Sequence, residues 1–330
     1  MTLYPLKFKP NYKEKIWGGN SLKKVLNKTG ASEKTGESWE ISGIEGELSV
    51  IANGFLQDND LQDLIEIYMG ELVGERIYAQ YGLEFPLLIK FIDAQDVLSI
   101  QVHPDDALAK ERHNAYGKTE MWYIIDAAEK ADIITGFNQK LDKAKYLEHF
   151  NKGELPQILK RESITQGDAF FMPAGRVHAI GKGTLLAEIQ QTSDITYRIY
   201  DWDRKDDKGN ERELHTDLAV DAIDFNMVNN AKIDYKQEVN HTTTLKRCNY
   251  FTTNILEFDQ IIARDYNLLD SFVIYMCMEG KFTIDYNGEE KIELSKGETV
   301  LIPNELSDIK LTPNGKAKIL EVYLEEIKEK

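Results

Sequence analysis

The sequence predicts a mainly β protein built from two related barrels, with a few short helices in its first half. Short β-type runs dominate the chain, turns containing glycine or asparagine separate them, and one corner motif occurs twice. The copies at 167–173 (GDAFFMP) and 297–303 (GETVLIP) each consist of a glycine, five mostly apolar residues and a proline. Each copy is typical of a turn leading into a strand that ends at a proline-fixed corner. The repetition favours a duplicated barrel over a chance match.

Hydrophobic periodicity gives the expected elements. Apolar residues at helical spacing predict a helix over 61–81, capped by Asp58 or Asn59, and shorter helices over 141–150 and 155–161. The run FPLLIKFI (85–92) has the length and composition of a buried strand. Further strands are expected at 97–102, 121–125, 168–172, 184–189, 251–258, 272–278, 281–286, 291–294, 299–302 and 319–324. The pair Asn287-Gly288 predicts a tight hairpin turn.

Length and composition set the domain organisation and narrow the partners. A chain of 330 residues predicts two domains, here a catalytic metal-binding barrel over 1–238 and a structural barrel over 239–330. The 56 acidic residues outnumber the 40 basic ones, and the net charge of -16 repels nucleic acid and anionic lipid. Without a membrane-length apolar run, a secretory leader or more than two cysteines, the chain is expected to be cytoplasmic. No obligate protein partner is indicated.

The residues that could carry chemistry lie in three short segments, QVHP (101–104), KTE (118–120) and PAGRVH (173–178). Each residue alone has an ordinary structural explanation, but barrel strands would bring the segments together. Side chains alternate along a strand, so Gln101 and His103 share one face. With Glu120 and His178 they offer two imidazoles, one carboxylate and one amide oxygen. This donor set suits zinc best, and iron, manganese or cobalt remain possible.

The same residues carry a family resemblance. The pattern Gly167-x5-Pro173-x-Gly175-x2-His178 resembles the second motif of the cupin superfamily, and QVHP followed by Glu120 resembles the first. More narrowly, seven ordered strings resemble type I mannose-6-phosphate isomerases in their short bacterial form: IWGG, GESWEIS, FPLLIKFIDA, LSIQVHP, GKTEMWYII, PAGRVHAIG and EIQQTSDITYRIYDWDR. The resemblance runs from about residue 5 to 205 and more faintly beyond. It implies two cupin-type jelly-roll barrels.

The resemblance also implies roles for individual residues. One zinc per chain would be held by Gln101, His103, Glu120 and His178, and Arg198 would be the catalytic arginine. The substrate, a phosphorylated hexose, would contact Ser99, Lys118, Lys90, Glu188 and Asp194. No histidine stands near either motif position of the C-terminal barrel, which is therefore expected to be metal-free.

Elementary chemistry agrees with an aldose–ketose isomerase acting through an enediol or enediolate. A single carboxylate ligand would leave the zinc site at net +1, and Lys90, Lys118 and Arg198 would gather positive charge for a sugar phosphate. If 188–198 runs extended, Glu188, Asp194 and Arg198 share one polar face. Two alternatives stay open: a metal-dependent cupin dioxygenase and a non-catalytic sugar-phosphate binder. The dioxygenase is disfavoured because Gln101 stands where a redox-active iron would favour imidazole or carboxylate. The non-catalytic binder is disfavoured because the full ligand set and Arg198 are present.

Overall fold

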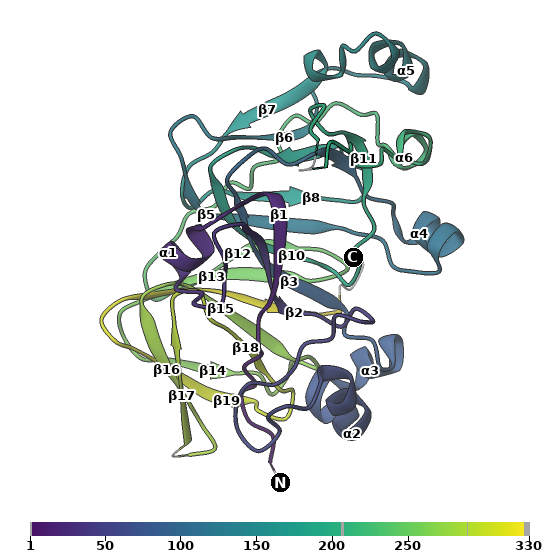
Figure 1. Ribbon diagram of the computed structural model, residues 1–330. Coiled ribbons are helices and arrows are strands. Elements are labelled where there is room, and N and C mark those ends of the chain that lie inside the picture. The colour runs from purple at the N-terminus through teal and green to yellow at the C-terminus, as the bar shows by residue number, and fades with distance from the viewer. Residues whose placement is uncertain (1, 206–207, 289, 327–330) are drawn as a thin grey trace.

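The computed structural model describes residues 2–205, 208–288 and 290–326, and strands dominate it (Figure 1). Strand pairing gives two sheets in the N-terminal part of the chain. The larger contains, in spatial order, β1 (Asn11–Gly19), β2 (Thr35–Ile41), β3 (Leu87–Ala94), β10 (Thr184–Gln191), β5 (Glu120–Ala127) and β8 (Ala169–Met172). The smaller contains β11 (Tyr197–Tyr200), β4 (Ile100–Val102), β9 (His178–Ile180), β6 (Asp132–Phe137) and β7 (Leu159–Ser163). We call this pair the N-terminal unit.

The C-terminal unit repeats this arrangement with two more sheets. Its larger sheet contains β12 (Thr242–Arg247), β13 (Thr252–Phe258), β20 (Ala317–Tyr323), β15 (Val273–Glu279) and β18 (Thr299–Ile302). Its smaller sheet contains β14 (Ile262–Asp265), β19 (Asp308–Pro313), β16 (Lys281–Tyr286) and β17 (Glu290–Ser295). The order β12-β13-β20-β15-β18 matches β2-β3-β10-β5-β8 strand for strand, and the two corner motifs contain the matching strands β8 and β18. Both motif glycines, Gly167 and Gly297, have a positive φ. The topology therefore supports the predicted duplication.

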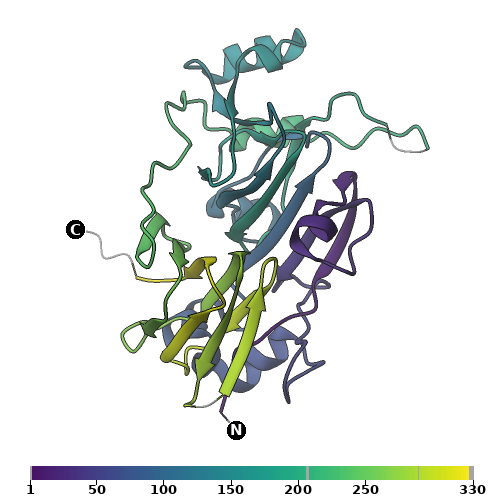
Figure 2. The same cartoon turned by 90° about the vertical axis from the view of Figure 1, so that its left-hand side faces the viewer.

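The two large sheets pack against each other through the faces that point away from their own smaller sheets. One apolar core combines residues of β3, β5 and β10, such as Ile89 and Met121, with residues of β15 and β20, such as Ile274 and Leu320. Separate cores fill the inside of each unit. The central strands are therefore buried on both faces, which explains the uninterrupted apolar run at 85–92. Figure 2 shows the yellow-green C-terminal unit below the teal part of the N-terminal unit.

The start of the chain belongs spatially to both units. In Figure 1 it begins at the bottom, beside the C-terminal strands, before it enters β1. Leu6 pairs with Leu301 of β18 through two backbone hydrogen bonds of 2.8 and 2.9 Å. The helices are α1 (Ser21–Leu26), α2 (Leu61–Val73), α3 (Glu75–Tyr81), α4 (Asp106–His113), α5 (Lys143–Asn151) and α6 (Thr216–Ala222). No helix in the described ranges is long and apolar enough to cross a membrane.

The expected helix at 61–81 is two helices, and the predicted cap was wrong. Asp60 caps α2 by accepting from Asp63 N at 2.9 Å. The helical run breaks inside α2 at Met69, where φ is +45°, and again at Gly74, where φ is +98°. A Cβ there would lie 2.7 Å from the carbonyl oxygen of Asp270, so only glycine fits this approach. The Asp270 carboxylate then accepts from the backbone N–H groups of Glu75 and Arg76. A residue almost 200 positions away thus caps α3, which local periodicity does not reveal.

The helix expected at 155–161 was also wrong. Only a single 3-10 turn (Leu155–Gln157) forms, and the chain continues as β7 along the edge of the smaller N-terminal sheet. Seven residues are too few for periodicity to distinguish a short helix from a turn and a strand. The hairpin at Asn287-Gly288 has a positive φ at both residues, as a tight turn requires.

Candidate active site

Three residues of the predicted site stand side by side across three strands. Gln101 of β4 is the register partner of His178 in β9 on one side and of Arg198 in β11 on the other. His103 follows directly after β4, and Glu120 is the first residue of β5 in the facing large sheet. The site therefore lies between the two sheets of the N-terminal unit, and segments more than 90 residues apart in sequence build it.

His103, Glu120 and His178 form a compact buried cluster. Their potential ligand atoms all lie within 4.8 Å of one another, and each residue is at most 1% exposed. His103 Nε2 lies 3.2 Å from Glu120 Oε1, and His178 Nε2 lies 3.6 Å from Glu120 Oε2. Neither carboxylate oxygen nor His103 Nε2 has a hydrogen-bond partner of good geometry. Buried acceptors left unpaired in this way suit a divalent cation.

Backbone carbonyls orient both imidazoles toward the cluster. Nδ1 of His103 donates to the carbonyl oxygen of Ile195, and Nδ1 of His178 donates to that of Arg176, each at 2.8 Å. This leaves Nε2 as the free nitrogen in both rings, as in most metal-binding histidines. Burial lowers the pKa of both, that of His103 to about 3 with a further contribution from Lys118. The two rings are therefore neutral at pH 7, the protonation state that a metal ligand needs.

Gln101 completes the possible ligand set. Its Nε2 lies 3.2 Å from Nε2 of His178, so the end of the amide reaches the cluster. Turning the amide by 180° would place its oxygen there instead. Two imidazoles, one carboxylate and one amide oxygen can therefore surround a single ion.

Lysines next to the cluster control its charge. Lys118 Nζ lies 3.0 Å from Glu120 Oε1. Burial opposes the charge on Glu120, but the ammonium group of Lys118 favours it and helps to hold the pKa of this carboxyl well below its usual range. Lys90 donates to Glu188 at 3.1 Å and Gln190 at 2.8 Å, and its Nζ lies 5.1 Å from the centre of the Trp39 ring. Burial opposes its charge as well, yet Glu188 and other carboxylates raise the Lys90 pKa.

A cavity of about 470 Å³ opens above the cluster. The predicted residues that line it are Lys90, Ser99, Gln101, Lys118, Glu188, Asp194 and Arg198. The three buried cluster residues lie beneath this lining, so the structure brings all ten predicted site residues to one place. Arg198 donates from Nη1 to the carbonyl oxygen of Glu213 at 2.8 Å, and burial and the neighbouring Arg212 lower its pKa.

The expected continuous strand over 188–198 was wrong. β10 ends at Gln191 in the large sheet, and β11 begins at Tyr197 in the small one. The connecting loop carries Asp194, which is exposed at the rim of the cavity. Glu188 and Arg198 reach the same cavity because the chain crosses between facing sheets, and strand parity played no part. Parity holds only within one strand.

Eleven further residues line the cavity without having been predicted as site residues, and they include Trp17, Glu37, Trp39 and Arg212. The first three fall in IWGG and GESWEIS, two strings already singled out by resemblance, so a signal for them existed. Arg212 had none, because it reaches the cavity from a loop and is held by Asp201 through hydrogen bonds of 2.7 and 2.5 Å.

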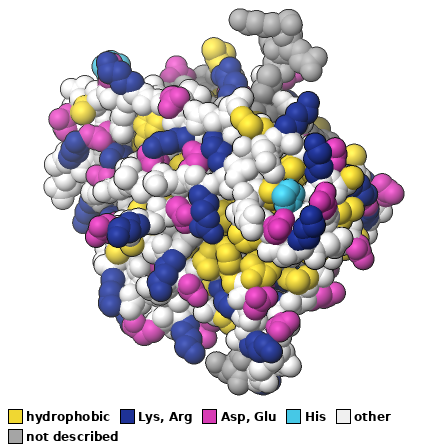
Figure 3. All heavy atoms as spheres, turned by 90° about the horizontal axis from the view of Figure 1, so that it is seen from above, with side chains coloured by type: hydrophobic (Ala, Val, Ile, Leu, Met, Phe, Trp, Pro, Cys, Tyr) yellow, Lys and Arg dark blue, Asp and Glu magenta, His cyan; other side chains and the backbone are white. Residues whose placement is uncertain are grey.

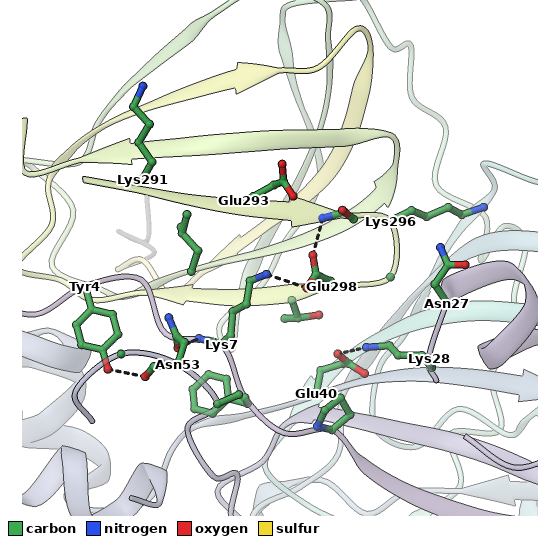
Figure 4. A pocket seen from close by; sticks show the side chains of 18 of the residues that line it. Tyr4, Lys7, Asn27, Lys28, Glu40, Asn53, Lys291, Glu293, Lys296 and Glu298 are labelled. Atoms are coloured by element: carbon green, nitrogen blue, oxygen red, sulfur yellow. Dashed lines mark hydrogen bonds and ion pairs between the residues drawn. The ribbon is translucent and has the colours of Figure 1, made fainter. Parts of the chain in front are cut away.

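A larger cavity of about 1040 Å³ lies elsewhere, between the start of the chain and β16–β18 (Figure 4). Two ion pairs form among its charged side chains: Lys28 donates to Glu40 at 2.6 Å, and Lys7 donates to Glu298 at 2.7 Å. Figure 4 shows both pairs among the side chains that line the cavity. None of its lining residues is a histidine. The smaller cavity, rather than this one, adjoins the potential metal ligands.

The acidic excess of the chain does not form a single block on the surface that can be seen. Figure 3 shows lysine and arginine side chains interspersed with acidic ones over the face viewed from above. The basic groups that matter to the site are instead gathered locally, because Lys90, Lys118 and Arg198 line one cavity.

A buried imidazole–carboxylate cluster between facing β-sheets, next to a polar cavity with several cations, could hold a metal ion and is typical of cupin proteins. Family models match residues 5–155 as the catalytic domain of type I phosphomannose isomerase and residues 240–324 as the cupin domain of mannose-6-phosphate isomerase. The mannose-6-phosphate isomerase ManA of Bacillus subtilis is 37% identical over 94% of this chain and 96% of its own. The Streptococcus mutans mannose-6-phosphate isomerase is 36% identical over 91% and 92%.

The chain belongs to the type I phosphomannose isomerase family. A crystal structure of mannose 6-phosphate isomerase from Bacillus subtilis is similar over 97% of this chain and 99% of that one, with a TM-score of 0.87 and 34% identity. A putative mannosephosphate isomerase from Archaeoglobus fulgidus, with a TM-score of 0.78 and 20% identity, shares the fold. The predicted family and the mainly β fold class are confirmed.

Proposed function

We propose that the protein is a zinc-dependent isomerase that interconverts mannose 6-phosphate and fructose 6-phosphate. The observation that carries this proposal is the placement of the buried His103–Glu120–His178 cluster, with its unpaired acceptors, next to a cavity lined by cations. Membership of the family and the names of its relatives supply the substrate.

The residues that would hold the zinc are Gln101, His103, Glu120 and His178. They fit it, because the rings are neutral with Nε2 free and one carboxylate leaves the site with net positive charge. When bound, zinc stabilises negative charge that develops on the substrate oxygens during proton transfer between adjacent carbons. We propose one ion per chain, since no comparable group of histidine, cysteine and carboxylate ligands occurs among the described residues of the C-terminal unit.

The phosphate end is proposed to lie against Ser99 and Lys118, with Lys90 near the sugar. Lys118 is 5% exposed and Ser99 is 3% exposed, so a hydrogen bond to either would be shielded from water. Lys90 is held by Glu188 and Gln190, which fixes its ammonium group. We propose that Glu188 and Lys90 together orient hydroxyl groups of the sugar. Asp194 at the rim would contact the far end of the substrate.

Arg198 is proposed as the residue that stabilises the enediolate. Its guanidinium keeps its proton at every working pH, so it suits binding a developing oxyanion better than removing a proton. Its backbone is the register partner of Gln101, which places it one strand away from a proposed ligand. The bond from Nη1 to the Glu213 carbonyl fixes one side of the group, and Nε is buried without a partner.

We also propose that residues 1–238 form the catalytic domain and that 239–330 form a structural one. The experiment that tests the function is a coupled assay with mannose 6-phosphate before and after chelation, combined with elemental analysis of bound metal. Turnover that disappears with the metal and returns with zinc supports the proposal. Oxygen uptake without isomerisation would indicate a dioxygenase, and tight sugar-phosphate binding without turnover would indicate a binding protein.

A further inference from the structure

Tyr250 joins the C-terminal unit to the catalytic part of the chain. It lies in the loop between β12 and β13 and is half-buried. Its hydroxyl donates to Asp106 Oδ2 at 2.7 Å. Asp106 is the first residue of α4, 144 positions earlier in the sequence. The bond therefore crosses between the two units.

The other oxygen of Asp106 connects this contact to the site strands. Oδ1 accepts from Gln191 Nε2 at 2.9 Å and from the backbone N–H of Gly117 at 2.8 Å. Gln191 is the last residue of β10, and Gly117 precedes the segment that carries Lys118. A Cβ on Gly117 would lie 2.6 Å from Asp106 N, so this approach of the two backbones requires glycine.

Gln191 in turn holds Thr119 by two hydrogen bonds. Its Oε1 accepts from the Thr119 N–H at 2.9 Å, and its own N–H donates to the Thr119 carbonyl at 3.2 Å. Thr119 stands between Lys118 and Glu120, and it is 4% exposed. The connected series Tyr250–Asp106–Gln191–Thr119 therefore ends on the backbone that aims both of these site residues.

We propose that Tyr250 is a positioning residue for the active site: through Asp106 and Gln191 it fixes the backbone that presents Lys118 and Glu120. This gives the C-terminal unit a part in catalysis although it contributes no ligand. The inference rests on the proposed function in one respect, namely that Glu120 binds a metal ion. The position of Glu120 matters because a buried carboxylate must meet its ligand at fixed geometry, and partners outside the ligand set maintain that geometry.

The first test measures backbone protection without metal. Amide hydrogen exchange is followed at Thr119 and Glu120 in chelated protein, comparing Tyr250→Phe with Tyr4→Phe. Tyr4 is the matched control, because its hydroxyl also joins two segments, donating to Asn53 O and accepting from Leu56 N, at the cavity of Figure 4. We expect Tyr250→Phe alone to accelerate exchange at Thr119, by about threefold to tenfold, since the opening free energy of this segment falls. Equal rates in the two variants would overturn the proposal.

The second test asks whether Tyr250 acts through Gln191. Release of bound metal to a chelator is timed for the wild type, Tyr250→Phe, Gln191→Leu and the double variant. We expect about threefold faster release for Tyr250→Phe, less than the 10- to 100-fold typical for a direct partner of a ligand. The double variant should match Gln191→Leu, because the link is already broken there. Additive effects would reject the route through Gln191.

These results are distinguishable from a failure of the proposed function. If the wild type retains no metal or shows no isomerase activity, the function is wrong, whereas the exchange comparison still decides whether Tyr250 orders the 118–120 backbone. If Gln191→Leu does not fold, the comparison of Tyr250→Phe with Tyr4→Phe remains, since each removes one hydroxyl and leaves the ring in place.

Discussion

At the strand positions where the N-terminal unit carries Lys90, Trp122 and Glu188, the C-terminal unit carries Asn254, Tyr275 and Glu321. The register is the same: Glu188 lies between Lys90 and Trp122, and Glu321 lies between Asn254 and Tyr275. Both units thus keep a buried carboxylate at one point of the large sheet. They differ in what surrounds it.

In the C-terminal unit the carboxylate is satisfied by its own chain. Glu321 accepts from Asn254 Nδ2 at 2.8 Å and from the Tyr266 hydroxyl at 2.5 Å, and Arg264 Nε lies 3.4 Å from it. Val273 stands where the register places Glu120 in the N-terminal unit. The residue eleven positions after Gly297 is the exposed Asp308, whereas the one eleven after Gly167 is the buried His178.

The difference shows how one scaffold serves two purposes. In the N-terminal unit the acceptors of Glu120 and His103 are left without hydrogen-bond partners, and the cavity above them is open to a ligand. In the C-terminal unit, Arg264 lies next to the Glu321 carboxylate, and Asn254 and Tyr266 donate hydrogen bonds to it. A buried charge needs compensation in either case. Glu321 obtains it from its own chain, as Glu188 does from Lys90, whereas Glu120 has Lys118 beside it and is proposed to obtain the rest from a metal ion.

The largest expected effect comes from the imidazoles. His103→Ala or His178→Ala should remove the metal and the activity together, because either change deletes one of the nitrogen donors. Metal content by elemental analysis and turnover by coupled assay measure this. Asp308→Ala, at the corresponding motif position of the C-terminal unit, should change neither. Two metal ions per wild-type chain, or metal retained after loss of either histidine, would contradict the asymmetry between the units.

Breaking the internal ion pair of the C-terminal unit should affect stability most. Glu321→Ala leaves Arg264 half-buried without its carboxylate, and losing one partner of a buried pair costs about 3–5 kcal/mol of the free energy of unfolding. Urea unfolding measures the loss, with the exposed Asp265→Ala as the control. Folded Glu321→Ala should still bind metal. A loss below about 1 kcal/mol would mean that the network contributes little to stability.

Arg198 tests the catalytic assignment in the N-terminal unit. Arg198→Ala should keep the fold and the metal but lower turnover by about 10²-fold or more, the scale of losing one oxyanion-stabilising donor. The Michaelis constant should move less, because the contact strengthens mainly in the transition state. Steady-state kinetics with metal analysis decide this. Normal turnover, or loss of the metal, would make Arg198 structural.

Lys118 tests how substrate is held. Lys118→Ala should weaken apparent substrate affinity by about 1.5–3 kcal/mol, typical of a hydrogen bond to a charged group. The variant also removes the ion-pair partner of Glu120, so metal content is measured alongside the Michaelis constant. Lys291→Ala, an exposed lysine at the other cavity, is the control. If neither the Michaelis constant nor turnover changes, Lys118 does not contact the substrate.

A pH dependence of stability should also originate in the N-terminal unit, and it is small only near neutral pH. The folded pKa values of His103 and His178 are lowered, mainly by burial, so protonation favours the unfolded chain. Metal-free protein should keep this contribution above about pH 6.5 and lose up to about 1.4 kcal/mol per histidine for each pH unit below it. For His103 the loss ends near pH 3. Urea unfolding across pH should show a shallower slope in His103→Gln.

The sequence by itself determined the family, the strand-rich fold and the candidate ligands, because these depend on local patterns. The corner motifs, the QVHP segment and the short apolar runs can all be recognised within about ten residues. The same reasoning failed at 61–81 and 155–161. There, a carboxylate from residue 270 caps a helix, and the edge of a sheet converts an expected helix into β7.

Only the tertiary structure decided which residues meet. Strand parity placed Glu188 and Arg198 on one face of a single strand, whereas the fold brings them together from two facing sheets. The contact from Tyr250 to Asp106 spans 144 residues, and no local pattern indicates it. The physical reason is that side-chain alternation and helical periodicity are properties of one segment, while a cavity, a buried ion pair or a bridge between units depends on how segments pack.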